Sequence, residues 1–600
     1  MGKLIINNFT HLHCHTSIGS MQDSMVSVDD LFKKAAEMDQ GSIAITDHGT
    51  MSAMFDARKA SLKHGVKFIP GIESYFVDDV SLKPDKKDIR TKRRHLILLA
   101  KNESGYRNLL KLNYEGFVNC QYIPILNKVF SRIDWDLLEQ YHENIICLTA
   151  CSAGLLAEEM FKINEDNEWD EEACHINVFK TASRLKNIFG EDLYLELQPH
   201  AFKKYKKDRK TEELELTKSG DPVLIADQTY INRKLLSISR ELDIPIVAAC
   251  DVHYLEKEDA SVHDMLMAIN DKKPLSDKNR HRYDIEEFYM KTGDKIVDYF
   301  TELVSRKVAL ELCNNTVGIA NKCDDSTYID VSDIRFPKFN VSVENDYQDF
   351  LKWRKKKNYN ASVTEVQAFM RYRCIKGFKK EFGHLRGEER KAYMRRIENE
   401  INVLEGHQFC SYMLITADLI SEAKRKKIRV GPGRGSVGGC FVAYLLGIHE
   451  VIPMQYGLLF ERFHNKEKTS YPDIDTDFSS SGRDQIEQYA VKKYGNKNVA
   501  HVSNLSTMTP KVVIKDLARS LELGGNKREA FKIANEITDT ISIDTKSFDG
   551  ALKDSEKLRS FCVQYPKIEE YGRKLVGLEK TFATHAAGIV ISDNDLSTYV

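Results

Sequence analysis

The chain has 600 residues, of which 30% are charged and 42% hydrophobic, with a formal net charge of −1 at pH 7. This length exceeds what one hydrophobic core supports, so we expect three or more domains. No apolar run is long enough to cross a membrane and the chain opens without a signal-peptide pattern, which predicts a cytoplasmic protein with no membrane partner. The 12 cysteines form no CxxC pair, which argues against a disulfide framework and a thiolate zinc finger.

The first 260 or so residues alternate short β-rich runs with helical stretches. This alternation predicts an α/β domain with a mostly parallel sheet or a barrel. The expected strands are 42–46, 67–69, 95–99, 144–148 and 244–249. Two lysine-rich insertions, 83–94 and 203–222, are interpreted as solvated loops. Residues 326–347 have neither helical nor strand period and are interpreted as a connector.

A basic helical stretch follows the connector. Between Leu351 and Arg396 there are fifteen Lys or Arg residues against four Glu. Apolar side chains recur at helical spacing, at Val366, Phe369, Met370, Cys374 and Phe378, and cations fill other positions, at Arg371, Arg373, Lys376, Lys379 and Lys380. A solvated amphipathic helix and a phosphate-contacting helix both fit this pattern.

Metal-ligand residue types occur in pairs and at strand ends. His13 and His15 are two residues apart, as are Asp251 and His253, and this spacing in a strand directs both side chains to one side. Further candidates follow or precede apolar runs, at Asp47, His48, Glu73, His95 and Cys151. Each alone is a common structural residue. Together they predict a site for two or three cations such as Zn²⁺ or Mn²⁺, or Fe, and such sites hydrolyse phosphate esters.

A glycine-rich turn, VGPGRGS, contains Gly433, Arg434, Gly435 and Ser436, and an apolar helix is expected to begin near Ser436. Backbone amides, a hydroxyl, a cation and a helix N-terminus together suit a polyphosphate. The turn is not a Walker A loop, because no GK[ST] follows. On the glycine pattern alone, a purely structural turn stays open.

The segment YPDIDTDF places Asp473, Asp475 and Asp477 at a period of two. A strand here would present the three carboxylates on one face, where they repel one another unless cations lie between them. A pair of Mg²⁺ ions, as in nucleotidyl transfer, resolves that repulsion. An acidic exposed edge strand is the alternative.

These motifs resemble a known family. The HxH opening, TDHG, GIE, HLILLAKN, the Cys loop and DVH resemble the PHP domain of bacterial DNA polymerase III alpha subunits. VGPGRGS, VAYLLGI, YGLLFERF, PDIDTDF, TMTPKVVIKDLAR and THAAGIVIS follow in the order of the C-family polymerase, so the resemblance covers essentially the whole chain.

The resemblance implies site residues in both regions. The PHP metal ligands would be His13, His15, Asp23, His48, Glu73, His95, Cys151, Asp251 and His253, with Asp23 following a segment one residue longer than usual. None is replaced, which implies an active phosphoesterase or 3′ to 5′ exonuclease. Asp473 and Asp475 would hold Mg²⁺ at the catalytic site, with Asp477 in support. Gly433, Arg434, Gly435, Ser436 and Arg462 would bind the nucleotide, and Lys511, Lys515 and Arg519 would contact DNA phosphates.

The resemblance also implies a domain order. A PHP (β/α) barrel-like domain over 1–275 would be followed by a polymerase beta-like nucleotidyltransferase palm over 276–504, a helical thumb over 505–568 and a resumed palm over 569–600. Family members are roughly twice as long, and their third catalytic aspartate, fingers and clamp-binding region would lie beyond Val600. A second polypeptide or a missing C-terminal segment would supply these parts and, through them, the sliding clamp.

The function implied is replicative DNA synthesis on primer-template DNA from deoxynucleoside triphosphates. Two alternatives remain. One is a stand-alone PHP phosphoesterase, because that ligand set lies wholly inside the chain, and the other is a non-catalytic DNA-binding subunit of a split polymerase.

Overall fold

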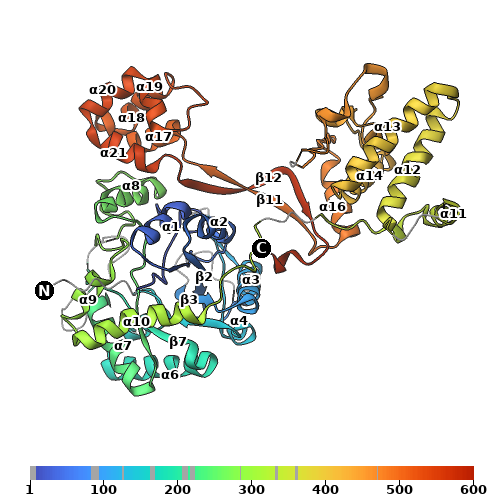
Figure 1. Cartoon of the computed structure of the whole chain (residues 1–600). Helices are drawn as coiled ribbons and strands as arrows, with labels where there is room; N and C mark the ends of the chain where they lie inside the picture. Colours follow the sequence, from blue (N-terminus) through green and yellow to red (C-terminus); the bar gives the residue numbers. More distant parts are fainter. Residues whose placement is uncertain are drawn as a thin grey trace. The chain divides into compact units, whose positions relative to one another are not determined.

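The computed structural model describes residues 9–82, 93–123, 128–162, 169–205, 214–215, 223–283, 285–331, 336–357, 362–468 and 471–599. The chain forms two compact units (Figure 1). The first comprises Met1–Val331, Ser503–Ala583 and Ser597–Val600, and the second comprises Ser332–Val502 and Thr584–Leu596. Most of the two lysine-rich insertions lies outside the described residues, as does part of the connector.

A six-stranded sheet organises the first unit. Its strands, in spatial order, are β1 (Ser42–Ile45), β2 (Lys67–Phe76), β3 (Arg94–Ala100), β6 (Ile145–Leu148), β7 (Leu193–Leu197) and β10 (Ile246–Ala248). The pairs β1–β2, β6–β7 and β7–β10 are parallel, whereas β3 is antiparallel to both of its neighbours. Backbone bridges join His11 to Ile43 and Cys14 to Val252, so the segment between them links the two ends of the sheet into a barrel-like curl.

The two faces of this sheet contact different partners, because successive side chains of a strand point to opposite sides. Leu96 and Leu98 of β3 belong to the large core that the sheet forms with its helices, whereas Ile97 and Leu99 belong to a smaller inner cluster. The helices in the large core are α1 (Val28–Glu37), α2 (Met54–His64), α3 (Glu103–Val118), α4 (Trp135–Tyr141), α5 (Leu155–Met160), α6 (Glu171–Phe189), α7 (Gln228–Leu242), α9 (Gly293–Phe300) and α10 (Arg306–Lys322). Two small antiparallel pairs also occur, β4 (Gln121–Ile123) with β5 (Lys128–Phe130) and β8 (Lys203–Tyr205) with β9 (Leu224–Asp227).

A helical subdomain completes the first unit. Leu266 of α8 shares a hydrophobic core with Leu517, Leu558 and Tyr571. Its helices are α8 (Ala260–Asn270), α17 (Pro510–Ser520), α18 (Lys527–Thr538), α19 (Phe548–Asp554), α20 (Glu556–Gln564) and α21 (Pro566–Leu575). The region 505–568, expected to be helical, consists mainly of helices. Helix α8, which follows β10 in the chain, packs into the same core.

The second unit is mainly helical. Its core contains Phe369, Phe378, Leu404, Met413 and Phe441. Its helices are α11 (Tyr347–Lys357), α12 (Glu365–Phe382), α13 (Gly387–Gly406), α14 (Cys410–Arg425), α15 (Phe441–Leu445) and α16 (Arg483–Tyr494). The periodic apolar stretch predicted as a helix is α12, whose first turn carries a capping box. Strands β11 (Val499–Thr507) and β12 (Glu579–Ile591) pair with each other, and each has residues in both units. Most of their side chains are exposed.

Two local predictions were wrong. No strand forms over 473–477, and the nearest pairing in the described chain is a single bridge between Phe478 and Val430. A strand requires a partner for its backbone groups, and alternation alone does not supply one. The helix expected from Ser436 is a short 3₁₀ turn, Ser436–Gly439, followed by α15. Two adjacent glycines at its end disfavour a continuous helix.

No helix in the described ranges is both long enough and apolar enough to span a bilayer.

Candidate functional site

The predicted metal ligands converge at one end of the curled sheet. In β2, Glu73 follows Ile69 by an even number of residues, and in β3, His95 precedes Ile97 by two, so each polar side chain lies on the same face as an inner-cluster residue. These two side chains contact each other, with Glu73 Oε1 2.9 Å from His95 Nδ1. The inner face is therefore apolar along part of its length and ligand-rich at its end.

His13, His15 and Asp251 form the first group. The Nδ1 atom of His13 lies 2.7 Å from Glu196 Oε1, and Nδ1 of His15 lies 2.8 Å from Ser20 Oγ. Their Nε2 atoms are 3.1 Å apart and lie 3.2 and 3.1 Å, respectively, from Asp251 Oδ1. A carboxylate only accepts, so Nδ1 of His13 carries a proton and its Nε2 is available as a metal ligand. Asp251 Oδ1 is buried without a hydrogen-bond donor, which fits a cation at this point.

The ionisation of this group follows from burial and charge. Burial lowers the pKa of His15 to about 3, with the nearby His48 and His253 acting in the same direction. Burial also opposes protonation of His13, but the carboxylates of Glu196 and Asp251 raise its pKa well above the ordinary value. The carboxylates around His13 therefore favour positive charge at this point, and either a proton on His13 or a bound cation can supply it.

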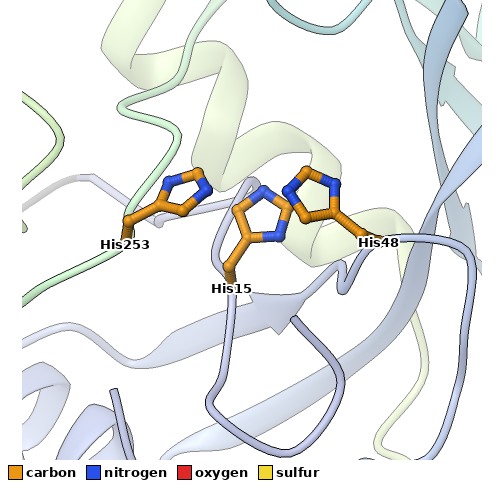
Figure 2. Close-up of side chains that lie close together, drawn as sticks. All are labelled: His15, His48 and His253. Carbon is orange, nitrogen blue, oxygen red and sulfur yellow. The ribbon is translucent and has the colours of Figure 1, made fainter. Parts of the chain in front are cut away.

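Glu73 joins a second group of ligands. Its buried carboxylate contacts His48 Nδ1 through Oε2, and its Oε1 lies 3.4 Å from His13 Nε2. Figure 2 shows the rings of His15, His48 and His253 with His15 between the other two, and the ring centroids are 4.1 Å apart for His15 and His48 and 4.4 Å for His15 and His253.

Three overlapping sets of ligand atoms result. Within the described residues, atoms lying within 4.8 Å of one another form the sets His15–His48–His253, His13–His15–Asp251 and His48–Glu73–His95. Shared histidines join the sets into one site, and its imidazole and carboxylate donors suit borderline divalent cations.

Asp23 reaches the same site despite the extra residue that precedes it. Its Oδ2 lies 3.1 Å from His48 Nε2, and the Tyr283 hydroxyl donates to its Oδ1 at 3.3 Å. The same hydroxyl is 3.3 Å from His253 Nε2. Burial opposes ionisation of Asp23, yet His48 and His253 hold its pKa well below the ordinary value.

Cys151 lies at the margin of the site. Its Sγ is 3.6 Å from His95 Nδ1, and the residue is partly exposed. Burial of the sulfur raises the pKa of the thiol well above its ordinary value. The structure thus brings all nine predicted ligands into one neighbourhood.

Two supporting residues were not recognised from the sequence as such. Glu196, fully buried in β7, holds His13, and the signal was a single charge within the apolar run LYLEL. Asp47, which the sequence offered as a ligand type, instead accepts from the Thr16 amide at 2.6 Å and the Ser20 hydroxyl at 2.9 Å. Burial raises the pKa of Asp47 to about 6. It fixes the loop whose Ser20 orients His15.

The glycine turn of the second unit lies beside the aspartates. Gly433 and Gly435 have φ of +103° and +75°, and a Cβ on Gly433 would lie 2.4 Å from His449 Cβ. Glycine is therefore required at Gly433. Arg434, between the two glycines in sequence, contacts both aspartates: its Nη1 lies 2.8 Å from Asp475 Oδ2 and its Nε lies 3.3 Å from Asp477 Oδ1.

The other predicted residues of this region are not joined by direct contacts. Ile474 and Phe478 pack against the core, so the predicted alternation of faces holds without a strand. Asp473, Ser436 and Arg462 are exposed, and in the described chain no hydrogen bond or ion pair links their side chains to Arg434 or the other aspartates.

The predicted DNA-contacting cations lie on α17. Lys511 is half-buried and Lys515 is exposed. Arg519 is engaged internally, with Nη2 3.0 Å from Asp516 Oδ1 and 3.4 Å from the Ile269 carbonyl oxygen.

The cations of α12 are largely used within the unit. Arg371 binds Glu405 through two hydrogen bonds of 2.7 Å, and Arg373 and Lys376 both contact Asp346, at 2.7 and 2.9 Å. These contacts favour the solvated amphipathic helix over the phosphate-contacting one.

Known proteins match both regions. Residues 11–200 match the family described as PHP domain, and residues 368–600 match the family described as bacterial DNA polymerase III alpha NTPase domain. Proteins named DNA polymerase III subunit alpha align along the chain. That of Borreliella burgdorferi is 35% identical over 599 residues, covering 99% of this chain and 46% of the relative. That of Campylobacter jejuni is 33% identical, with 98% and 46% covered, and that of Aquifex aeolicus is 31% identical, with 99% and 48% covered.

The chain spans about half the length of the curated relatives it matches. The resemblance expected from the sequence motifs is confirmed, including the N-terminal PHP domain. Metal dependence is a property of the matched families, and the ligand sets of the first unit agree with it.

Proposed function

We propose that this chain, which belongs to the C family of bacterial DNA polymerases and carries an N-terminal PHP domain, combines a metal-dependent phosphoesterase with part of a DNA-synthesising centre. One observation supports the phosphoesterase activity: the Nε2 atoms of His13 and His15 both lie close to Asp251 Oδ1, a buried oxygen that accepts no hydrogen bond. Its proposed substrate is the 3′ end of DNA, so that it acts as a 3′ to 5′ exonuclease.

The proposed PHP ions are Zn²⁺ or Mn²⁺, or Fe. The residues that would hold them are His13, His15, Asp23, His48, Glu73, His95, Cys151, Asp251 and His253. Divalent cations supply charge that activates water and neutralises phosphoryl oxygens. The chain's own contribution is orientation, because Glu196 fixes the tautomer of His13, and Ser20, itself bonded to Asp47, fixes His15.

The proposed synthetic centre lies in the second unit. Asp473 and Asp475 would hold Mg²⁺, with Asp477 in support. Arg434 would leave the carboxylates to bind the triphosphate together with Ser436 and Arg462 and the amides of Gly433 and Gly435. Lys511, Lys515 and Arg519 are proposed to contact duplex phosphates on the helical subdomain.

We further propose the domain division of a PHP domain from 1–275, a palm over 276–504 resumed over 569–600, and a thumb over 505–568. One boundary of this division is revised. Ile296 of α9 and Leu312 of α10 lie in the core of the PHP domain, so both helices are proposed to belong to that domain and the palm is proposed to begin after Val331. The curated relatives are about twice as long, so residues corresponding to their remaining half, in the same chain or a second polypeptide, are proposed to supply the rest of the centre and sliding-clamp contacts. The proposed location is the cytoplasm, where bacterial chromosomal DNA is replicated.

The test is a paired assay of primer extension and 3′-end hydrolysis. The chain is assayed alone and with the residues of the remaining half supplied. We expect Mg²⁺-dependent extension only in the second case, abolished by Asp475→Asn, and hydrolysis abolished by Asp251→Asn but not by Asp475→Asn. Hydrolysis without extension in any mixture would leave a stand-alone phosphoesterase, and DNA binding without either activity would indicate a non-catalytic subunit.

A further inference from the structure

A buried ion pair on α13 contacts the loops of the proposed synthetic centre. Arg396 and Glu400 are one helical turn apart, with Nε 2.5 Å from Oε1. The Glu400 side chain is fully buried and that of Arg396 is 20% exposed. Arg396 is the last cation of the basic stretch, and Glu400 lies outside every motif of the proposed site.

Each partner also binds a neighbouring segment. Glu400 Oε2 accepts the amide of Val442 at 2.8 Å and the thiol of Cys440 at 3.4 Å. Arg396 Nη2 donates to the carbonyl oxygens of Gly439 and Leu458, at 2.8 and 3.1 Å. The pair therefore joins α13 to two loops.

Those two loops carry the proposed nucleotide-binding residues. Gly439 ends the turn that begins at Ser436, and Leu458 lies four residues before Arg462. The loops approach each other closely, since a Cβ on Gly439 would lie 2.5 Å from the Leu459 carbonyl oxygen. One guanidinium thus bonds both loops where their backbones meet.

Stability alone does not account for this arrangement. Replacing a buried ion pair by well-packed apolar side chains is often neutral or stabilising. A planar guanidinium, by contrast, offers several donors in fixed directions and so sets the separation of the two carbonyl groups it binds.

We infer that Arg396 and Glu400 are positioning residues for the triphosphate site, holding the turn of Arg434 and Ser436 at a fixed distance from Arg462. This inference rests on the proposed function. It predicts that the pair acts on nucleotide binding only through the residues it positions.

The experiment measures binding of a fluorescent deoxyadenosine triphosphate, with Mg²⁺, to the full 600-residue chain. Arg396→Met is expected to weaken binding about tenfold, because displacement of a binding group by about 1 Å has effects of that order or larger. Arg396→Lys should recover part of the affinity. Glu400→Gln should also weaken binding, because a glutamine whose oxygen accepts from Val442 turns its amide nitrogen, a donor, toward the Arg396 guanidinium.

A double-mutant cycle separates positioning from general destabilisation. Arg396→Met should weaken binding less in the Arg434→Ala background than in the wild-type chain, because one of the residues that Arg396 positions is already absent. The matched control is Lys493→Met. Lys493 is 18% exposed and binds Glu344 and Asp418, each at 2.7 Å, away from both loops. It should lower the melting temperature without changing nucleotide affinity.

Four results would overturn the inference. Unchanged affinity in Arg396→Met, or an effect additive with that of Arg434→Ala, would refute positioning while leaving the proposed function intact. An equal loss of affinity in Lys493→Met would show that the effect is only loss of stability. Absence of saturable binding by the wild-type chain would refute the proposed triphosphate site, and this inference with it.

Discussion

Arg434 Nη1 lies 2.8 Å from Asp475 Oδ2, so a proposed triphosphate ligand and a proposed metal ligand are bonded to each other. The Arg434 side chain is 57% exposed and that of Asp475 is 39% exposed, and ion pairs this open to solvent are weak. The Arg434 guanidinium therefore neutralises the Asp475 carboxylate only weakly, and a divalent cation can displace it from the carboxylate.

Arg434→Gln should strengthen Mn²⁺ binding at the aspartates by about two- to fivefold, since it removes a competing cation held by a weak exposed pair. Calorimetric titration of Mn²⁺ into chain already saturated with Zn²⁺ measures this. Asp475→Asn is the control that should abolish the signal. Weaker Mn²⁺ binding in Arg434→Gln would contradict competition.

The purified chain should contain Zn²⁺, Mn²⁺ or Fe, and removing it with a chelator should lower the melting temperature by about 5 °C or more, because ligand binding stabilises the folded state. Asp251→Asn should lose metal in elemental analysis. His64→Gln is the control, since His64 binds Asp29 at the surface and no cluster residue. Equal metal content in wild type and Asp251→Asn would mean that the ligands are misassigned.

Gly433→Ala should reduce nucleotide binding, and primer extension in the mixture that contains the remaining half, by about a hundredfold, because alanine is strained at a φ of +103° and its Cβ would overlap His449. Gly438→Ala is the matched control. Its Cβ would meet nothing within 4 Å, so activity should change little. If both substitutions have similar effects, the left-handed conformation of Gly433 is not what the site requires.

Binding of primer-template DNA should weaken steeply with salt despite the near-neutral net charge, and Lys515→Gln should lower the slope of log affinity against log salt by about one unit. Arg371→Met should leave that slope unchanged and lower the free energy of unfolding by about 1–3 kcal/mol, since Arg371 binds Glu405 twice. Salt titrations and urea denaturation measure the two effects. A lower slope in Arg371→Met would restore the phosphate-contacting interpretation of α12.

The sequence by itself determined features that depend on local periodicity. The spacing of two predicted that His13 and His15 direct their side chains to one side, where their Nε2 atoms lie 3.1 Å apart, and the helical spacing of α12 identified its buried side. The motifs identified the family and all nine residues that gather around the PHP site, because a side chain of a metal-ligand type can be recognised in the sequence before its partners are known.

Only the tertiary structure decided which group each side chain meets. Asp47 and Glu196 are both buried acids near the cluster, yet the chain's closure brings Glu196 to His13 and turns Asp47 toward Thr16 and Ser20. The spacing of Arg371, Arg373 and Lys376 on α12 also fits phosphate contacts, but in the folded chain Glu405 and Asp346 bind these three cations. The segment carrying Asp475 alternates like a strand, but no segment in the described part of the chain pairs with residues 473–477. Periodicity is a property of consecutive residues, whereas hydrogen-bond and charge partners are set by packing between segments far apart in the chain.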